Sequence, residues 1–270
     1  QAGALFELSP FTKIFVQGPE ATIAMQWLCS NNVDVAVGGV VYTLLLNHRA
    51  GIEGELTVIR LAQDQYLLTT ASLTRVRDTD WVRRHTTQFD IEVIDRTDDY
   101  SVLGVMGPNA QGLLEDLCNE SFGLTDFPFA TSRQVDLGGS PVRASRLSFV
   151  GESGWEILID KDHAVAVLDQ VIEAGKARHI GMAGIMTMEC CRLEKGYLHW
   201  GHEIGPEENP YHAGLGFAVK KSKPGGFLGL EALEKLDPVQ DKSLVLFRAT
   251  DTRPLLLHDE PIYLGGRWIG

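Results

Sequence analysis

The chain has few of the residues that mark metal-binding or disulfide-stapled proteins. Its four cysteines, at positions 29, 118, 190 and 191, form no C-x-x-C pair, and its eight histidines form no H-x-H or H-E-x-x-H pattern. Neither a metal site nor a disulfide framework is therefore predicted. We expect the four thiols to be small buried hydrophobic side chains in a reducing compartment, either the cytoplasm or, in a eukaryote, the mitochondrial matrix.

Basic residues and long apolar runs are also scarce. The chain carries 24 Lys and Arg against 36 Asp and Glu, a net charge of −12, which disfavours nucleic acid and anionic membranes as partners. No apolar run approaches the roughly 20 residues that span a bilayer. The basic cluster at residues 220–223 is equally consistent with an anion site and with a solvated turn. No strand-like run precedes a G-x-G-x-x-G pattern, so no flavin site is expected within this chain.

A strand–turn–helix pattern occurs twice in what is present. The sequence FVQGPEA begins at Phe15, and GVMGPNA begins at Gly104. In each copy a Leu-Cys pair ends eleven residues after the Gly of the Gly-Pro step. Proline suits the first turn of a helix, where its missing N–H is not needed. The pattern predicts two similar strand–turn–helix units.

The remaining elements predict an α+β fold. Strands are expected at residues 40–47, 55–61, 65–69, 91–94, 102–106, 142–149 and 155–159, and helices at residues 72–88, 162–179 and 183–195. Their order resembles a split βαβ arrangement. Pro238 marks an expected boundary between residues 1–237, with two intertwined α+β subdomains, and residues 238–270. The latter are expected to hold strands at 242–247 and 261–264 and a hairpin at Gly265-Gly266.

One acidic residue, Glu156, lies inside the strand expected at residues 155–159. Alternation places Trp155 on one face of that strand, with Glu156 and Leu158 on the other. If both faces are covered, Glu156 is a buried carboxylate that needs partners. It could accept paired N–H groups from an arginine or from a 2-aminopterin ring. The residues alone favour the arginine pair.

The helix expected at residues 183–195 carries Arg192 beside an apolar stripe. We expect Met186, Cys190 and Leu193 to point inward. Arg192 is then either a surface charge or a guanidinium fork that clamps a carboxylate or carbonyl group. The helical spacing by itself favours the surface charge.

Two aromatic residues and a second glutamate complete the candidate set. Tyr197 and Trp200 are flanked by glycines, as in a pocket wall against a flat ligand, although packing in the core explains them equally well. Glu55 is expected to be the first residue of its strand, after a glycine-containing turn. There it could act as a general acid/base, stabilise a developing cation, or be a solvated turn residue, and the pattern alone favours the solvated turn residue.

Together, these segments resemble the aminomethyltransferase (glycine-cleavage T-protein) family. They are most similar to the folate-binding portions of sarcosine and dimethylglycine dehydrogenases and oxidases. The matching pieces span residues 4–233 in the family's order: LFELSPFTKIFVQGPEA, VVYTLLLNHRAGIEGELTVIRL, LGVMGPNAQGLL, LSFVGESGWEI, RLEKGYLHWGHEI, NPYHAGLGFAVK and FLGLEAL. The resemblance implies an α+β fold around a central folate pocket, with most of the family's C-terminal β-barrel missing after residue 238.

The resemblance also assigns site residues. The family pattern Y-T-G-E-x-G-x-E falls on residues 149–156, so the glutamate that holds the pterin maps to Glu156 and the family tyrosine becomes Phe149. The arginine of the L-R-L-E motif maps to Arg192, and the aromatic residue of the following L-Y-G maps to Trp200. The catalytic aspartate maps to Glu55, which keeps the charge but moves it by about one methylene group.

The implied function is the binding of tetrahydrofolate and one-carbon transfer to it. The donor would be a small N-methyl amine oxidised by an FAD-containing domain or subunit outside this chain, and the product 5,10-methylenetetrahydrofolate. A stand-alone aminomethyltransferase and a non-catalytic folate-binding module are alternatives. A structural domain without a ligand would require Glu156 to be paired with a cation of the protein.

Overall fold

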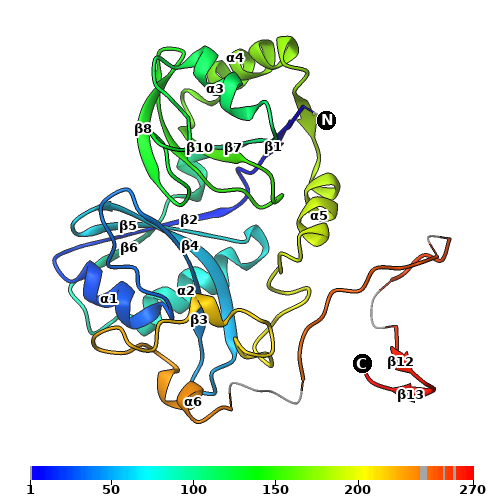
Figure 1. Ribbon diagram of the computed structural model, residues 1–270. Helices are drawn as coiled ribbons and strands as arrows, with labels where there is room; N and C mark the ends of the chain where they lie inside the picture. Colours follow the sequence, from blue (N-terminus) through cyan, green and yellow to red (C-terminus); the bar gives the residue numbers. More distant parts are fainter. Residues whose placement is uncertain (1, 238–241, 252, 258–259) are drawn as a thin grey trace.

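Two β-sheets face one another, and helices cover their outer faces. The computed structural model describes residues 2–237, 242–251, 253–257 and 260–270. In Figure 1 one sheet, with α3 and α4 beyond it, forms the upper half of the molecule, and the other sheet, with α1 and α2, forms the lower half. The expected α+β class is confirmed, because antiparallel sheets and helices both form and stay in separate layers.

The lower sheet has five antiparallel strands in the order β3-β4-β5-β2-β6. Its strands are β2 (Thr12–Gln17), β3 (Val40–Leu46), β4 (Ile52–Ala62), β5 (Gln65–Thr70) and β6 (Glu92–Asp95). A buried cluster that includes Met25, Leu56 and Val82 joins its outer face to α1 (Ala21–Leu28) and α2 (Arg75–His85). The short 3-10 helices η1 (Ser72–Thr74) and η2 (Thr97–Asp99) precede α2 and follow β6.

The upper sheet has six strands in the order β11-β1-β7-β10-β9-β8, and only the β1–β11 pair is parallel. Its strands are β1 (Ala4–Glu7), β7 (Tyr100–Met106), β8 (Ser132–Leu137), β9 (Ser140–Ser145), β10 (Gly154–Asp160) and β11 (Gly181–Ala183). Trp155 and neighbouring apolar residues pack its outer face against α3 (Ala110–Leu117) and α4 (Ala164–Ala177).

The two predicted strand–turn–helix units are confirmed as β2–α1 and β7–α3. Gly18 and Gly107 adopt φ values of 138° and 114° between strand and helix, in a region that side chains rarely allow. A Cβ atom would also come within 2.6 Å of the Asp90 carbonyl oxygen at Gly18, and within 2.5 Å of the Gly3 Cα atom at Gly107. Each helix ends at a buried cysteine, Cys29 or Cys118, as expected.

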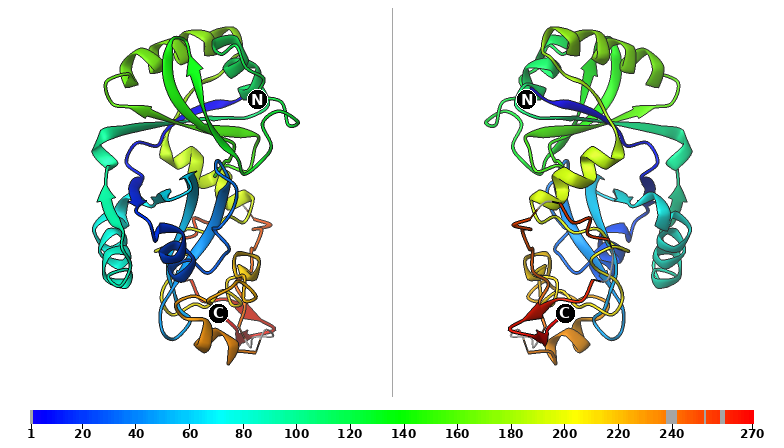
Figure 2. Two further views of the ribbon diagram at one scale, coloured as in Figure 1. Left: turned by 90° about the vertical axis from the view of Figure 1, so that its left-hand side faces the viewer. Right: turned by 90° about the vertical axis from the view of Figure 1, so that its right-hand side faces the viewer.

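The inner faces of the two sheets are joined by apolar contacts. One cluster contains Phe15 and Ile59 of the lower sheet and Leu158 of the upper sheet. Residues 198–236, with η3 (Gly216–Ala218) and α6 (Leu230–Glu234), pack against Leu44, Leu46 and Ile52. The helix α5 (Ile185–Glu194) lies between the upper and lower halves of the molecule in all three views (Figures 1 and 2).

Several boundaries differ from the sequence-based expectation. The β3–β4 turn is shorter than predicted, so β4 begins at Ile52 and Glu55 is its fourth residue rather than its first. Among the described residues, the segment expected as a strand at 242–247 forms none: Leu244 N–H donates to the His212 carbonyl, and Val245 to Phe247 are exposed. A strand needs a neighbouring strand for its backbone groups.

The predicted hairpin around Gly265-Gly266 is confirmed as β12 (Tyr263–Leu264) and β13 (Arg267–Trp268). Both glycines have positive φ, as a two-residue hairpin turn requires. The boundary expected at Pro238 lies outside the described residues. No helix within the described part of the chain is long and apolar enough to cross a membrane.

Candidate active site

Glu55 lies on the inner face of the lower sheet, with both carboxylate oxygens hydrogen-bonded to its own chain. Its register partner on β3 is Leu44, which places Tyr42 diagonally beside it. The Tyr42 hydroxyl donates to Oε2 at 2.5 Å, and the Trp200 backbone N–H donates to Oε1 at 2.7 Å. Burial raises the pKa of Glu55, although both hydrogen bonds oppose that rise. Burial likewise raises the pKa of Tyr42, so its hydroxyl remains a proton donor.

Trp200 is fixed by contacts on both its backbone and its ring. Its indole N–H donates to the Ile52 carbonyl at 2.7 Å, near the start of β4. The guanidinium carbon of Arg77, on α2, lies 3.5 Å from the ring centroid. Arg77 also donates to the Glu53 carbonyl and forms a 2.9 Å ion pair with the buried Asp78. Two elements of the lower half, β4 and α2, thus hold Trp200 against Glu55.

Arg192 is buried, which corrects the expectation of a surface charge. It forms ion pairs of 2.7 Å with Glu189 and Glu203, and it donates to the Tyr197 carbonyl at 3.1 Å. Burial works to lower its pKa, but the hydrogen bonds to the two glutamates outweigh burial and raise it. The guanidinium group of Arg192 therefore bonds to groups of its own chain, and it holds in place the turn that carries Trp200.

The orientation of α5 explains that correction. Met188 and Arg192 are its buried residues, whereas Met186, Cys190 and Leu193 are exposed. The helix turns the side opposite to the predicted stripe toward the protein. Paired carboxylates offset the cost of burying the guanidinium, which hydrophobic spacing does not reveal.

Phe149 and Tyr197 lie together beside the same turn. Their rings stack with centroids 6.4 Å apart, and the His199 ring meets Phe149 edge-on at 6.3 Å. Phe149 is half-buried and Tyr197 is 43% exposed. His199 lies 3.4 Å from Glu189, and burial lowers its pKa. The aromatic pair is therefore connected to the residues that surround Arg192.

Glu156 lies on the inner face of the upper sheet without a recorded partner. Its neighbours across the sheet are Gly104, which has no side chain, and Ser145, whose hydroxyl is hydrogen-bonded to Ser132 at 2.9 Å. The inner-face cluster around it includes Phe6, Met106 and Phe149. Within the described residues, no hydrogen bond or ion pair reaches the Glu156 carboxylate: Arg192 is paired with Glu189 and Glu203, and Lys195 with Glu152.

The environment makes this carboxylate unusual. Burial raises the pKa of Glu156 to about 7, although the side chain retains some exposure to solvent. A carboxylate that is partly withdrawn from water is stabilised by donors, and none of the described basic side chains supplies them. The arginine pair that the sequence favoured is thus not formed: Arg192 binds Glu189 and Glu203 instead.

The structure brings most of the predicted residues together around α5 and the turn after it. Phe149 belongs to the apolar cluster on the Glu156 side and also contacts Tyr197. Glu55 interacts electrostatically with Arg192 and Glu203. The sequence reading missed Tyr42 and Arg77. Tyr42 comes beside Glu55 only in the observed register, which follows from the shorter β3–β4 turn, and nothing local identifies Arg77.

Other polar clusters have different roles. Lys223, in the basic cluster at 220–223, is buried, and its ammonium donates to the backbone carbonyls of Gln26 (2.6 Å), Cys29 and Asn31 (2.9 Å). Burial lowers its pKa to about 8. It therefore joins the segment after η3 to the end of α1. No group of three or more described His, Cys, Asp or Glu residues could hold a metal ion.

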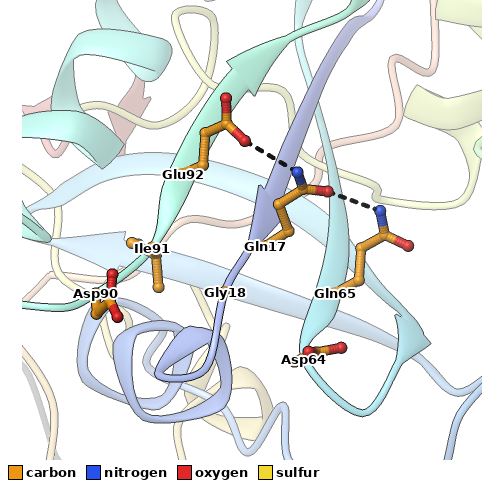
Figure 3. A pocket seen from close by; sticks show the side chains of 7 residues that line it. All are labelled: Gln17, Gly18, Asp64, Gln65, Asp90, Ile91 and Glu92. Carbon is orange, nitrogen blue, oxygen red and sulfur yellow. Dashed lines mark hydrogen bonds between the residues drawn. The ribbon is translucent and has the colours of Figure 1, made fainter.

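A surface cavity of about 520 Å³ lies at the ends of β2, β5 and β6 (Figure 3). Gln17 links Gln65 and Glu92 by hydrogen bonds of 3.1 and 2.9 Å. The other lining residues include Asp64 and Asp90, and none of the lining residues is basic. Neither Glu55 nor Glu156 lines it, so this acidic cavity is separate from the residues described above.

Comparisons with known proteins decide the family. The model of the GCVT N-terminal domain matches residues 1–223. The chain belongs to the GCVT aminomethyltransferase family. This family binds tetrahydrofolate and carries out folate-dependent one-carbon transfer. The expected resemblance is thereby confirmed.

The relatives of this GCVT family member include both oxidoreductases and transferases. The 4-methylaminobutanoate oxidase (formaldehyde-forming) of Paenarthrobacter nicotinovorans is 39% identical over 98% of this chain and 32% of its own length. Human mitochondrial sarcosine dehydrogenase is 34% identical over 100% of this chain and 31% of its own length. The aminomethyltransferase of Halothermothrix orenii is 34% identical over 98% of this chain and 74% of its own length. The chain therefore spans about a third of the length of these two oxidoreductases.

A solved relative confirms the aminomethyltransferase fold. The glycine cleavage system aminomethyltransferase T from Bartonella henselae superposes with a TM-score of 0.77 at 27% identity, over 86% of this chain and 62% of that one. A heterotetrameric sarcosine oxidase from Corynebacterium superposes with a TM-score of 0.53 at 21% identity, a likeness of fold alone.

Proposed function

We propose that this GCVT domain binds tetrahydrofolate with its pterin on Glu156. The supporting observation is the half-buried Glu156 carboxylate, which has no partner among the described residues and a pKa raised by burial to about 7. A 2-aminopterin ring presents two parallel N–H donors, which suit the two oxygens of one carboxylate. A ligand-free structural role would instead require a cation of the protein beside Glu156, and Arg192 is bonded elsewhere.

Aromatic side chains would complete the folate site. Phe149 belongs to the apolar cluster on the Glu156 side, and Tyr197 stacks against it, so both are available to a flat ring. Phe149 lacks the hydroxyl of the family tyrosine, which leaves stacking as its contribution. We assign Trp200 to the wall beside Glu55, and Arg192 to positioning the turn that carries Tyr197 and Trp200.

Glu55 is the proposed acid/base. Transfer of a one-carbon unit at the formaldehyde level joins the carbon to two folate nitrogens and releases its oxygen as water. Glu55 would accept in turn the proton that each nitrogen loses as it bonds to the carbon, and would pass both protons to the oxygen, which leaves as water. A pKa raised by burial favours such exchange near neutral pH. Tyr42 and the Trp200 N–H hold the carboxylate in one orientation.

The proposed carbon source is a small N-methyl amine, oxidised by an FAD-containing domain or subunit. The relatives in support are the formaldehyde-forming oxidase and sarcosine dehydrogenase, of which this chain matches about a third. Product formation beside the folate site would raise the local concentration of the one-carbon unit. Residues 1–237 would form the folate-binding region, and residues 238–270 would begin the family's β-barrel. A mitochondrial relative is compatible with the matrix as one location.

Anaerobic calorimetry with tetrahydrofolate tests the folate proposal. The wild-type chain is expected to bind one equivalent, and Glu156→Gln is expected to weaken binding about a hundredfold, because a charged acceptor is lost and an amide donor faces the ligand's donors. Glu152→Gln is the matched control, since Glu152 is exposed and belongs to the same segment. Equal affinities for wild type and Glu156→Gln would refute the assignment.

A second candidate function is a non-catalytic folate-binding module. It is favoured by the hydrogen bonds that already occupy both Glu55 oxygens, which give this residue a structural role. Rates decide between the two functions. The rate of 5,10-methylenetetrahydrofolate formation is measured after subtraction of the uncatalysed condensation of formaldehyde with tetrahydrofolate. If Glu55→Gln then forms the product as fast as wild type, the non-catalytic module is the better description.

A further inference from the structure

A second cavity, of about 440 Å³, lies between the two sheets. Leu61, near the end of β4, lines it, whereas Glu55 lies six residues earlier on the same strand. Six residues of extended strand span about 20 Å, so the cavity is remote from Glu55. Leu158, two residues after Glu156, also lines it. The cavity is thus distinct from the Glu55 site but adjacent to Glu156.

The most informative lining residue is Arg143. It lies on β9, opposite Gln134 on β8 and Leu158 on β10, so these three side chains form a row across the inner face of the upper sheet. Arg143 is half-buried, and burial lowers its pKa. Its recorded hydrogen bond is a long one, 3.4 Å, to the Ser132 hydroxyl. Among the described residues it forms no ion pair.

An unpaired guanidinium in this position is costly for the protein. A charged group partly withdrawn from water loses hydration, and a carboxylate partner normally compensates. Arg133, which lies opposite Ala144 in the strand beside it, has such a partner in Glu120 at 3.5 Å. Arg143 has none in the described structure. An anion bound in the cavity would supply it.

Arg96 provides a second cation on the lining. Its Nε donates to Asp99 at 2.9 Å, and its guanidinium carbon lies 5.2 Å from the Phe15 ring centroid and 5.0 Å from that of Tyr100. The aromatic contacts hold the side chain in place. Gln65 and Gln134 add amide groups to the lining. The remaining lining side chains are mainly apolar, including Leu61 and Val142.

We propose that this cavity binds a small organic carboxylate with an apolar body, anchored by Arg143 and supported by Arg96. Guanidinium groups bind carboxylates through paired N–H donors, and the apolar lining suits a short carbon chain better than it suits a fully hydrated oxyanion. Arg143 belongs to β9 of the upper sheet, and Arg96 directly follows β6 of the lower sheet, so the ligand would bridge the two halves of the molecule. This proposal does not depend on the folate assignment.

Calorimetric titration of the full chain with butyrate, glutarate and inorganic phosphate tests the proposal. Each carboxylate is expected to bind at one site per chain and more tightly than phosphate. Arg143→Gln should weaken carboxylate binding about tenfold or more, whereas Arg143→Lys should lose less. Arg84→Gln, an equal charge change on the exposed side of α2, should leave the affinity within about twofold of wild type. Arg96→Gln provides an independent reading if Arg143→Gln does not fold.

Three results would overturn the proposal. No saturable carboxylate binding by the wild-type chain would remove the site. Phosphate binding as tight as carboxylate binding, and equally dependent on Arg143, would refute the ligand class. Competition between glutarate and tetrahydrofolate, with a parallel loss of both affinities in Arg143→Gln, would assign the cavity to the acidic end of the folate. Unchanged tetrahydrofolate binding in Arg143→Gln supports the separate site.

Discussion

Glu55 and Glu156 are two carboxylates on opposing sheets with opposite local environments. Both lie on inner sheet faces, and burial raises the pKa of both. Glu55 receives hydrogen bonds from Tyr42 and Trp200 on its two oxygens, whereas Glu156 has no donor among the described residues. Equal burial therefore does not imply an equal role. The satisfied carboxylate has its position fixed by the fold, and the unsatisfied one has a bonding capacity that remains for a ligand.

The largest expected effect separates these two roles. Glu55→Gln should slow 5,10-methylenetetrahydrofolate formation at least about a hundredfold, because an amide does not exchange the proton. Tetrahydrofolate affinity should change by less than about threefold, since Glu55 is bound by its own chain. The transfer rate is measured after subtraction of the uncatalysed condensation, and the tetrahydrofolate affinity is measured by calorimetry. Glu156→Gln should instead weaken tetrahydrofolate binding strongly and change the transfer rate of the bound complex much less.

Glu55→Asp is the matched variant, since it keeps the charge and supplies the residue that the family motif carries. It should retain more activity than Glu55→Gln. If both variants lose affinity rather than rate, Glu55 is a binding residue, and the contrast with Glu156 disappears.

The pH dependence of stability provides the next test. The folded-state pKa of Glu156 is about 7 against an ordinary value of 4.5, so the folded chain binds more protons than the unfolded chain between these values. The stability contribution is fully present below pH 4.5 and is lost as pH rises through 7, by about 3 kcal/mol at most. Denaturant unfolding of wild type and Glu156→Gln at pH 5 and pH 8 should differ by this amount. An identical pH dependence would show that Glu156 is not desolvated.

A smaller effect is expected when a donor to Glu55 is removed. Tyr42→Phe deletes a 2.5 Å hydrogen bond to a buried carboxylate, and should lower the free energy of unfolding by about 1.5–3 kcal/mol at neutral pH. Because this bond lowers the pKa of Glu55, the variant should also shift the pH–rate profile of transfer upward. Tyr211→Phe is the control for the loss of a hydroxyl, since Tyr211 contacts Lys221 through its ring. An unchanged profile would refute the coupling.

The smallest effect concerns the support behind Trp200. Arg77→Lys keeps the charge but removes the planar group that stacks on the indole at 3.5 Å. It should cost about 0.5–1 kcal/mol of stability, as measured by urea unfolding, and should lower the transfer rate less than Tyr42→Phe does. Arg84→Lys, at an exposed position on the same helix, controls for the substitution itself. A larger loss of activity than in Tyr42→Phe would place the main support of Glu55 at Arg77.

Local patterns predicted most of the fold but fewer of its contacts. The Gly-Pro steps predicted both strand–turn–helix units because Gly18 and Gly107 satisfy a backbone requirement that is local. The strand at 242–247 failed because a strand depends on hydrogen bonds to another strand. The prediction of which face of α5 points inward was wrong, because Arg192 is buried in ion pairs with two glutamates. The spacing of apolar residues contains no information on paired charges.

The sequence by itself determined the family, the α+β class and the positions of Glu55 and Glu156 on strands, because motif order and side-chain alternation are properties of the chain. Only the tertiary structure decided which carboxylate has partners. Tyr42 and Trp200 reach Glu55 from positions 13 residues before and 145 residues after it. No cation reaches Glu156 within the described structure, since Arg192 is held by Glu189 and Glu203. Partner choice depends on distances between elements, which packing alone sets.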